Sequence, residues 1–205
     1  MPLIRKTPDE AAKAIAAAGP AASLTDASAE MRWTAGRLAA DNPGSVPALT
    51  EALARESDDR VREAIFTALA RIATPQSVLA VLPYVRSNDA NLRTGALDAL
   101  RAMPSLTERH LAQLISDPDS DVRLLACDLA RVTTGVHASR LLCELVETDP
   151  EANVCAAAVE VLAEIGNADA IQPLARCAAR FPNDPFLKFA IEAATSRLAR
   201  HADRV

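Results

Sequence analysis

The feature that most constrains this chain is an internal repeat with a period of 30 to 33 residues. Most copies carry an acidic residue, then an apolar residue followed by a basic one, and then a stretch rich in Ala and Leu, as in the segment that begins at Asp58. The apolar anchors of the six copies are Met31, Val61, Leu92, Val122, Val154 and Leu187. A period of this length indicates a stack of supersecondary units that share one continuous core.

Each anchor is predicted to begin a helix. When the anchor is counted as position zero, apolar residues recur near +4, +7 or +8, and +11, which is one face of a helix. Asp58, Asp89 and Asp119 lie three residues before their anchors, where a carboxylate can accept hydrogen bonds from the first free amides of the helix. A second, shorter helix is predicted before each of these, over 46–53, 77–85, 108–115, 138–146 and 170–178.

The chain is therefore predicted to form one repeat array with distinct ends. The array spans 28–198 as a single domain, and 199–205 form a C-terminal tail. Residues 1–27 are expected to hold an N-terminal capping helix and a linker, because Thr7 can cap a helix that ends at Gly19. Terminal units of this kind cover the open end of a stacked core.

The pattern D-x-x-V-R-x-x-A, followed by A-L-x-x-I, resembles the short bacterial HEAT-like repeat of the phycobilisome-lyase type. The resemblance covers about 28–198. It implies an all-α fold, a right-handed α-solenoid (an α-α superhelix) of about six short HEAT-like helix pairs, with the second helix of each pair on the concave face. It also implies a ladder of acidic and basic residues between repeats, whose basic rungs would be Arg32, Arg62, Arg93, Arg123 and Lys188. Cys155 would interrupt this ladder in the fifth copy.

Composition and charge limit the cellular compartments and the classes of binding partner that this chain is expected to have. The net charge of −5 weighs against nucleic acid, because phosphate binding needs clustered basic residues. No apolar stretch is long enough to span a membrane, so a cytoplasmic protein is expected. The four cysteines form no C-x-x-C pair and are expected to be reduced and buried. Cys127 and Cys155 lie on adjacent second helices, which leaves a redox or ligand role open for them.

No catalytic, cofactor-binding or metal-binding residues are expected. His110, His137 and His201 form no H-E-x-x-H pattern, and the chain has no Walker loop and no G-x-S-x-G motif. The sequence thus favours a non-enzymatic scaffold or adaptor. The resemblance leaves a chromophore-lyase-like subunit, acting on a tetrapyrrole or its carrier protein, as the alternative. A nucleic-acid binder and a self-associating unit are further alternatives, and the pattern does not specify the oligomeric state.

The second helices carry the candidate binding surface. At about 100° per residue, positions +2, +5, +6 and +9 point away from the core, and many of them are apolar. We predict that an apolar track with basic anchors binds a protein partner through Trp33, Arg37, Phe66, Leu97, Arg101, Leu124, Arg131 and Val159. Charged residues such as Glu63, Asp98 and Glu160 would form its rim. The alternative is that the superhelix packs these side chains against neighbouring repeats.

Overall fold

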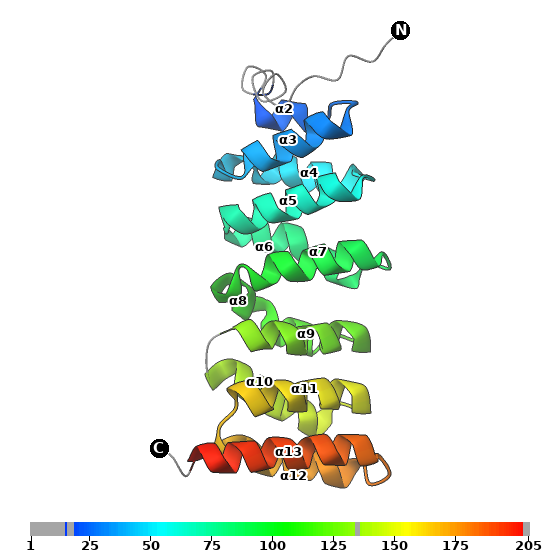
Figure 1. Ribbon diagram of the computed structural model, residues 1–205, viewed down its shortest axis with the longest axis vertical. Coiled ribbons are helices and arrows are strands. Elements are labelled where there is room, and N and C mark those ends of the chain that lie inside the picture. Colours follow the sequence, from blue (N-terminus) through cyan, green and yellow to red (C-terminus); the bar gives the residue numbers. More distant parts are fainter. Residues whose placement is uncertain (1–14, 16–18, 134–135, 203–205) are drawn as a thin grey trace. The chain divides into compact units, whose positions relative to one another are not determined.

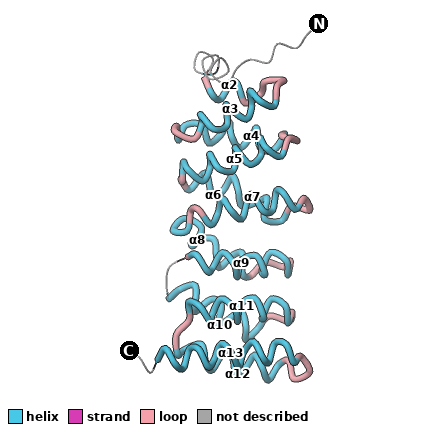
Figure 2. The backbone as a smooth tube through the Cα atoms, in the orientation of Figure 1, coloured by secondary structure: helices cyan, strands magenta, loops and turns pink. Residues whose placement is uncertain are grey.

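The computed structural model describes residue 15, residues 19–133 and residues 136–202. Across these residues the fold is all-α, with short loops between helices and no strand (Figure 2). The chain divides into two compact units, Met1–Met103 and Pro104–Val205, and each unit is a stack of helix pairs (Figure 1). The all-α repeat fold predicted from the sequence is confirmed. The boundary between the units falls inside 28–198, which the repeat pattern predicts to be a single array.

The first unit has two layers of helices. Its second helices are α3 (Ala29–Ala39), α5 (Asp59–Ile72) and α7 (Ala90–Arg101). Within this layer α3 packs on α5, and α5 packs on α7. The other layer holds α2 (Pro20–Ser23), the turn η1 (Pro43–Ser45), α4 (Val46–Arg55), α6 (Pro75–Val81) and the turn η2 (Leu82–Arg86). The change from α6 to a 3₁₀ turn coincides with Pro83, which has no amide proton for an α-helical hydrogen bond.

The second unit repeats this plan. Its second helices are α9 (Ser120–Val132), α11 (Ala152–Ile165) and α13 (Pro185–Ala202), and α11 packs between the other two. The other layer holds α8 (Pro104–Ile115), α10 (Val136–Thr148), the turn η3 (Ala168–Ala170) and α12 (Ile171–Arg180). Helix α13 continues to Ala202, so part of 199–205, predicted from the sequence to be a C-terminal tail, is helical.

The core consists of small and aliphatic side chains between the two layers of each unit. The anchors Val61, Val122, Val154 and Leu187 are at most 1% exposed, as the helical periodicity predicts. Small core residues allow neighbouring helices to approach closely. Within 19–133 and 136–202, no helix combines the length and the apolar character that crossing a membrane would require.

The acidic residues before the anchors act as helix caps, as predicted. Asp58 accepts hydrogen bonds from the amides of Arg60 and Val61, and Asp89 caps α7 in the same way. Asp119 caps α9 through a single bond from the amide of Asp121. These bonds, led by that from the amide of Asn91, lower the pKa of Asp89. The side chain of Glu151 makes no capping bond. The predicted capping helix of the N-terminus lies outside the described residues apart from Ile15, which is helical and fully buried.

Candidate partner-binding surface

The track of exposed apolar residues predicted along the second helices is wrong at three of its positions. Phe66, Leu97 and Val159 are only 3%, 7% and 1% exposed. All three occupy position +5, and in α5 this position faces the next second helix, α7. The ring of Phe66, for example, lies against Gly95 of α7 and meets Tyr84 edge-on, with ring centroids 5.6 Å apart. A second helix in a stack has neighbours on both sides as well as a core beneath it, so a residue that points away from the core can still be buried.

The more exposed face of the second helices is formed by positions −1, +2, +6 and +9, and we call it the second-helix surface. Trp33 lies on it in the first unit and is half-buried. Two guanidinium groups lie over its ring, with the Arg37 Cζ atom 4.7 Å and the Arg60 Cζ atom 5.2 Å from the ring centroid. Such cation–π contacts hold the indole in one orientation. Trp33 and Arg37 therefore remain available at the surface, as predicted from the sequence.

A pocket of about 450 Å³ opens on this surface between α5 and α7. It is lined by Glu63, Phe66, Thr67, Ala70, Arg71, Gly95, Asp98, Ala99 and Ala102. The pocket exists because the side chains between the two helices are small. The Phe66 ring occupies the space where a side chain at Gly95 would begin, since a Cβ there would lie 2.5 Å from it. Phe66 thus belongs to the candidate site as a wall of the pocket, although it is not an exposed anchor.

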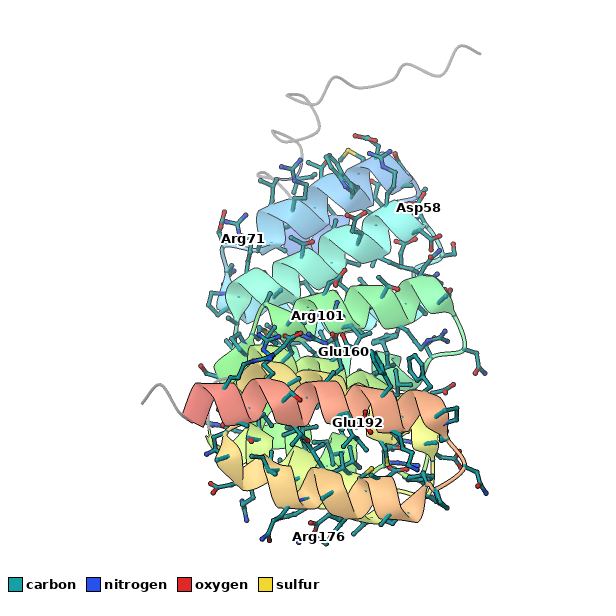
Figure 3. All side chains as sticks on the ribbon, turned by 60° about the horizontal axis from the view of Figure 1, so that its bottom comes forward. Asp58, Arg71, Arg101, Glu160, Arg176 and Glu192 are labelled. Atoms are coloured by element: carbon teal, nitrogen blue, oxygen red, sulfur yellow. The ribbon has the colours of Figure 1, made fainter. Side chains whose placement is uncertain are left out.

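Charged side chains surround the pocket, and most of them are already paired. Arg71 projects from the end of α5 opposite to Asp58 (Figure 3) and forms an ion pair of 2.7 Å with Asp41. Asp98 forms an ion pair of 2.6 Å with Arg101, which is half-buried. Glu63 is different. Of the acidic side chains in 19–103, all of which the structure describes, it is the one that forms no hydrogen bond or ion pair.

The second-helix surface of the second unit is more acidic. Arg131 of α9 is surrounded by three carboxylates, those of Asp128, Glu160 and Glu164, of which Glu160 lies 3.2 Å away. The hydrogen bond with Glu164 is the main reason why the pKa of Arg131 is raised. The guanidinium group of Arg131, which was predicted to contact a partner, therefore already has carboxylate partners within the protein. Leu124 on the same helix is half-buried.

The most exposed aromatic side chains of the described chain were not among the predicted binding residues. Phe186 and Phe189 of α13 are 74% and 70% exposed and lie one helical turn apart. Phe189 occupies position +2, as Trp33 does. Phe186 occupies position −1, which is polar in every other copy: Glu30, Arg60, Asn91, Asp121 and Asn153. This departure from the repeat was the sequence signal that could have identified Phe186.

The basic rungs Arg32 and Arg123 are structural, but they pair with carboxylates other than the acidic rungs expected from the resemblance, which lie three residues before the anchors. Arg32 forms two hydrogen bonds with Glu56, and Arg123 forms two with Asp149. These carboxylates lie two residues before the helix cap, and each also accepts the amide of the cap residue. The hydrogen bond from Arg32 is the main reason why the pKa of Glu56 falls to about 2. Arg62 alone follows the expected ladder, with an ion pair of 3.1 Å to Asp89.

Three of the four cysteines are buried in the second unit, as expected, whereas Cys143 of α10 is half-buried. Cys127 and Cys155 are fully buried, and burial is the main reason why the pKa of Cys127 rises to about 12. A hydrogen bond with Cys177, followed by burial, raises the pKa of Cys155. Where Cys155 replaces the basic rung, Arg180 of α12 supplies a guanidinium instead, and it donates to the carbonyl of Val146 at 2.7 Å. Within 19–133 and 136–202, no three His, Cys, Asp or Glu side chains converge to hold a metal ion.

Two layers of paired helices with a small-residue core define an α-helical repeat protein. The family model for HEAT repeats matches residues 17–101 and 107–195, so this chain belongs to the HEAT repeat family. No curated protein sequence matches the chain.

Several solved structures share the architecture. The archaeal HEAT-like repeats protein from Thermococcus onnurineus NA1 is 11% identical, with a TM-score of 0.51 over 88% of this chain and 86% of that one. A designed armadillo repeat protein is 15% identical, with a TM-score of 0.44 over 87% and 98%. The complex of CpcE and CpcF of phycocyanin lyase from Nostoc sp. PCC7120 is 15% identical, with a TM-score of 0.39 over 97% of both chains. At these identities the likeness concerns the fold alone.

Proposed function

We propose that this protein is a non-enzymatic scaffold that holds a protein partner on its second-helix surface. The observation that carries the proposal is the exposed pair Phe186 and Phe189, which are 74% and 70% accessible on one side of α13. Large apolar side chains that lie together in contact with water commonly mark interaction sites. Aromatic residues dominate binding energy where a partner buries them.

Burial of the two phenyl rings supplies enough free energy for recognition. Fully burying one Phe side chain contributes about 1.5–3 kcal/mol, so the pair contributes about 3–6 kcal/mol. Every 1.4 kcal/mol changes a dissociation constant about tenfold. Loss of both rings is therefore expected to weaken partner capture at least tenfold.

We also propose that the repeats are of the short bacterial phycobilisome-lyase type. The segment Asp119–Ala126 has the pattern D-x-x-V-R-x-x-A of the short bacterial phycobilisome-lyase-type repeat. Structurally, Asp119 caps α9 and Arg123 joins neighbouring helix pairs, which are the roles that this pattern implies. The repeat therefore supplies a rigid support, and the exposed side chains on it supply recognition.

The test compares two variants of the full chain that differ only in which exposed apolar residues they lose. The first is the double variant Phe186→Ser, Phe189→Ser. The control is Leu79→Ser on α6, where Leu79 is 56% exposed on a first helix. Each is used to capture proteins quantitatively from extracts of the native cell. We expect the Phe variant to lose proteins that the wild type and the Leu79 variant both retain. Equal capture by all three would refute the proposal.

A further inference from the structure

We propose that the pocket between α5 and α7 receives an arginine side chain presented by the protein partner. This inference rests on the proposed function and adds the chemistry of the group that is recognised. Its basis is the combination of a pocket with apolar walls and a carboxylate, that of Glu63, which no group of the described protein neutralises.

The charge around the pocket favours a cation. Arg71 and Asp98 on its rim are matched by Asp41 at 2.7 Å and Arg101 at 2.6 Å. The charges within each of these two pairs cancel, so the carboxylate of Glu63 leaves one negative charge in excess at the opening of the pocket. Two other exposed glutamates of the same unit do have a basic neighbour, Glu30 in Arg60 and Glu51 in Arg55. A partner cation is the group that would complete the pattern at Glu63.

The walls of the pocket favour a guanidinium group among cations. Ala70, Ala99 and Ala102 present methyl groups, and Phe66 and Gly95 form the surface between the two helices. The aliphatic stem of arginine can lie along such a surface while its head group remains at the rim. A guanidinium group is planar and more weakly hydrated than an ammonium group, and it can bond two carboxylates at once. Glu63 and the outer oxygen of Asp98 offer acceptors on opposite helices.

The pocket also depends on a glycine, Gly95, at a repeat position where no other copy has glycine. Position +3 is Gly95 in α7 but Thr34, Ala64, Leu125, Ala157 and Ala190 in the other second helices. Because a Cβ at Gly95 would lie 2.5 Å from Phe66, the glycine is what allows a phenyl ring at position 66 and an open space above it. Arginine binding would explain why this one junction combines Gly, Phe and an unpaired carboxylate.

The test uses a defined probe, so the partner need not be known. The ¹⁵N-labelled full chain is titrated with the capped peptide acetyl-Gly-Gly-Arg-Gly-Gly-amide, and backbone amide shifts are followed by NMR. The matched probe replaces arginine with citrulline, which has the same shape without the charge. The matched variants are Glu63→Gln at the pocket and Glu51→Gln on α4, where Glu51 pairs with Arg55.

We expect saturable shifts at Thr67, Gly95 and Asp98 with the arginine peptide, with a dissociation constant of about 1 mM for a single side chain. The citrulline peptide and the Glu63→Gln variant should each weaken binding about fivefold or more, and Glu51→Gln should not. Equal shifts with both peptides, or equal binding by the wild type and Glu63→Gln, would overturn the inference.

The titration and the capture experiment fail independently. The titration measures the pocket without any partner, and the capture experiment measures partner binding through Phe186 and Phe189. If the peptide does not bind while capture depends on the two Phe residues, the arginine inference is wrong and the scaffold function stands. If the peptide binds while capture does not depend on them, the pocket is real and the proposed function is wrong.

Discussion

Arg123 and Asp149 form a nearly buried ion pair that joins consecutive helix pairs in the second unit. The Nε atom of Arg123 donates to Oδ2 of Asp149 at 2.6 Å, and the second bond, from Nη2 to Oδ1, is 3.1 Å long. The two side chains are 12% and 1% exposed. The same carboxylate accepts the amide of Glu151 at the start of α11. One acidic side chain therefore orients a loop and links two repeats.

Removing the arginine of this pair is expected to be costly. Arg123→Met leaves the Asp149 carboxylate buried without its cation, and breaking such a pair costs about 3–5 kcal/mol. The control is Arg140→Met, because Arg140 pairs with Glu144 at a site where both side chains are more than 60% exposed, and such pairs contribute about 0–1 kcal/mol. Urea unfolding measures both. A loss below 1 kcal/mol for Arg123→Met would contradict the assigned role.

The Arg32–Glu56 pair predicts a specific pH dependence. The pKa of Glu56 is about 2 in the folded protein against an ordinary value of 4.5, chiefly because of the hydrogen bond from Arg32. A depressed pKa contributes stability that is fully present above pH 4.5 and is lost as the pH falls towards 2. At 1.36 kcal/mol per pH unit, the contribution is about 3 kcal/mol.

The measurement for Glu56 compares the wild type with Glu56→Gln in urea at pH 7, 4 and 3. The wild type should be more stable by about 3 kcal/mol at pH 7, and the difference should shrink steadily below about pH 4.5. A difference in unfolding free energy that stays constant over this range would show that the ionisation of Glu56 does not contribute.

Two glycines on second helices should respond oppositely to alanine. At Gly95 a Cβ would lie 2.5 Å from the buried ring of Phe66, whereas at Gly36 it would lie 3.6 Å from its nearest neighbours, an ordinary contact. Gly95→Ala should therefore destabilise the protein by about 1–3 kcal/mol through overpacking. Gly36→Ala should stabilise it by up to about 1 kcal/mol, because alanine has the higher helix propensity.

Phe66→Ala provides the check on this pair of glycines. Removing the ring should cost about 3–5 kcal/mol, since Phe66 is buried. In that background Gly95→Ala should cease to be destabilising, because the clashing atoms are gone. Thermal and urea unfolding of the four proteins of the cycle give the coupling free energy. An additive cycle would mean that Phe66 and Gly95 are not packed as described.

The interrupted ladder at Cys155 predicts that restoring the repeat pattern is harmful. Cys155 is fully buried and its thiol donates to the carbonyls of Val146 and Asp149, and Arg180 already donates to the carbonyl of Val146. Cys155→Arg should therefore lower stability by more than about 1 kcal/mol, because it places a second guanidinium in an occupied site. Arg180→Ala should offset part of this loss. A stabilising Cys155→Arg would show that Arg180 does not replace the missing rung.

The sequence predicted the helices and most of their caps because both are local. The anchors recur with helical periodicity, and Asp58, Asp89 and Asp119 form hydrogen bonds with amides two or three residues away. The exposure of Phe66, Leu97 and Val159 could not be predicted in this way. A helical wheel has one buried side, whereas the ring of Phe66 also packs against Gly95 of the next second helix, α7.

Other structural features could not be predicted because they arise from differences between the repeat copies. The carboxylates of Glu56 and Asp149 occupy one repeat position, but the third copy has Ser87 there, so the acidic pattern is incomplete in sequence. Arg180 replaces the rung missing at Cys155 from a different helix, and no spacing reveals that substitution. Glu63 was recognised as a rim residue, but its lack of a partner became evident only from the positions of the surrounding charges.

The central claim is that a protein partner contacts the second helices, and site-specific photocrosslinking in the native cell tests it most directly. A photoreactive residue is placed on the second-helix surface at Thr67 or Phe189, and for comparison on first helices at Leu79 of α6 or Gln113 of α8, all of which are exposed. We predict crosslinks to another protein from Thr67 and Phe189 and none from Leu79 or Gln113. Crosslinks of equal yield from all four positions, or from the first helices alone, would contradict the account.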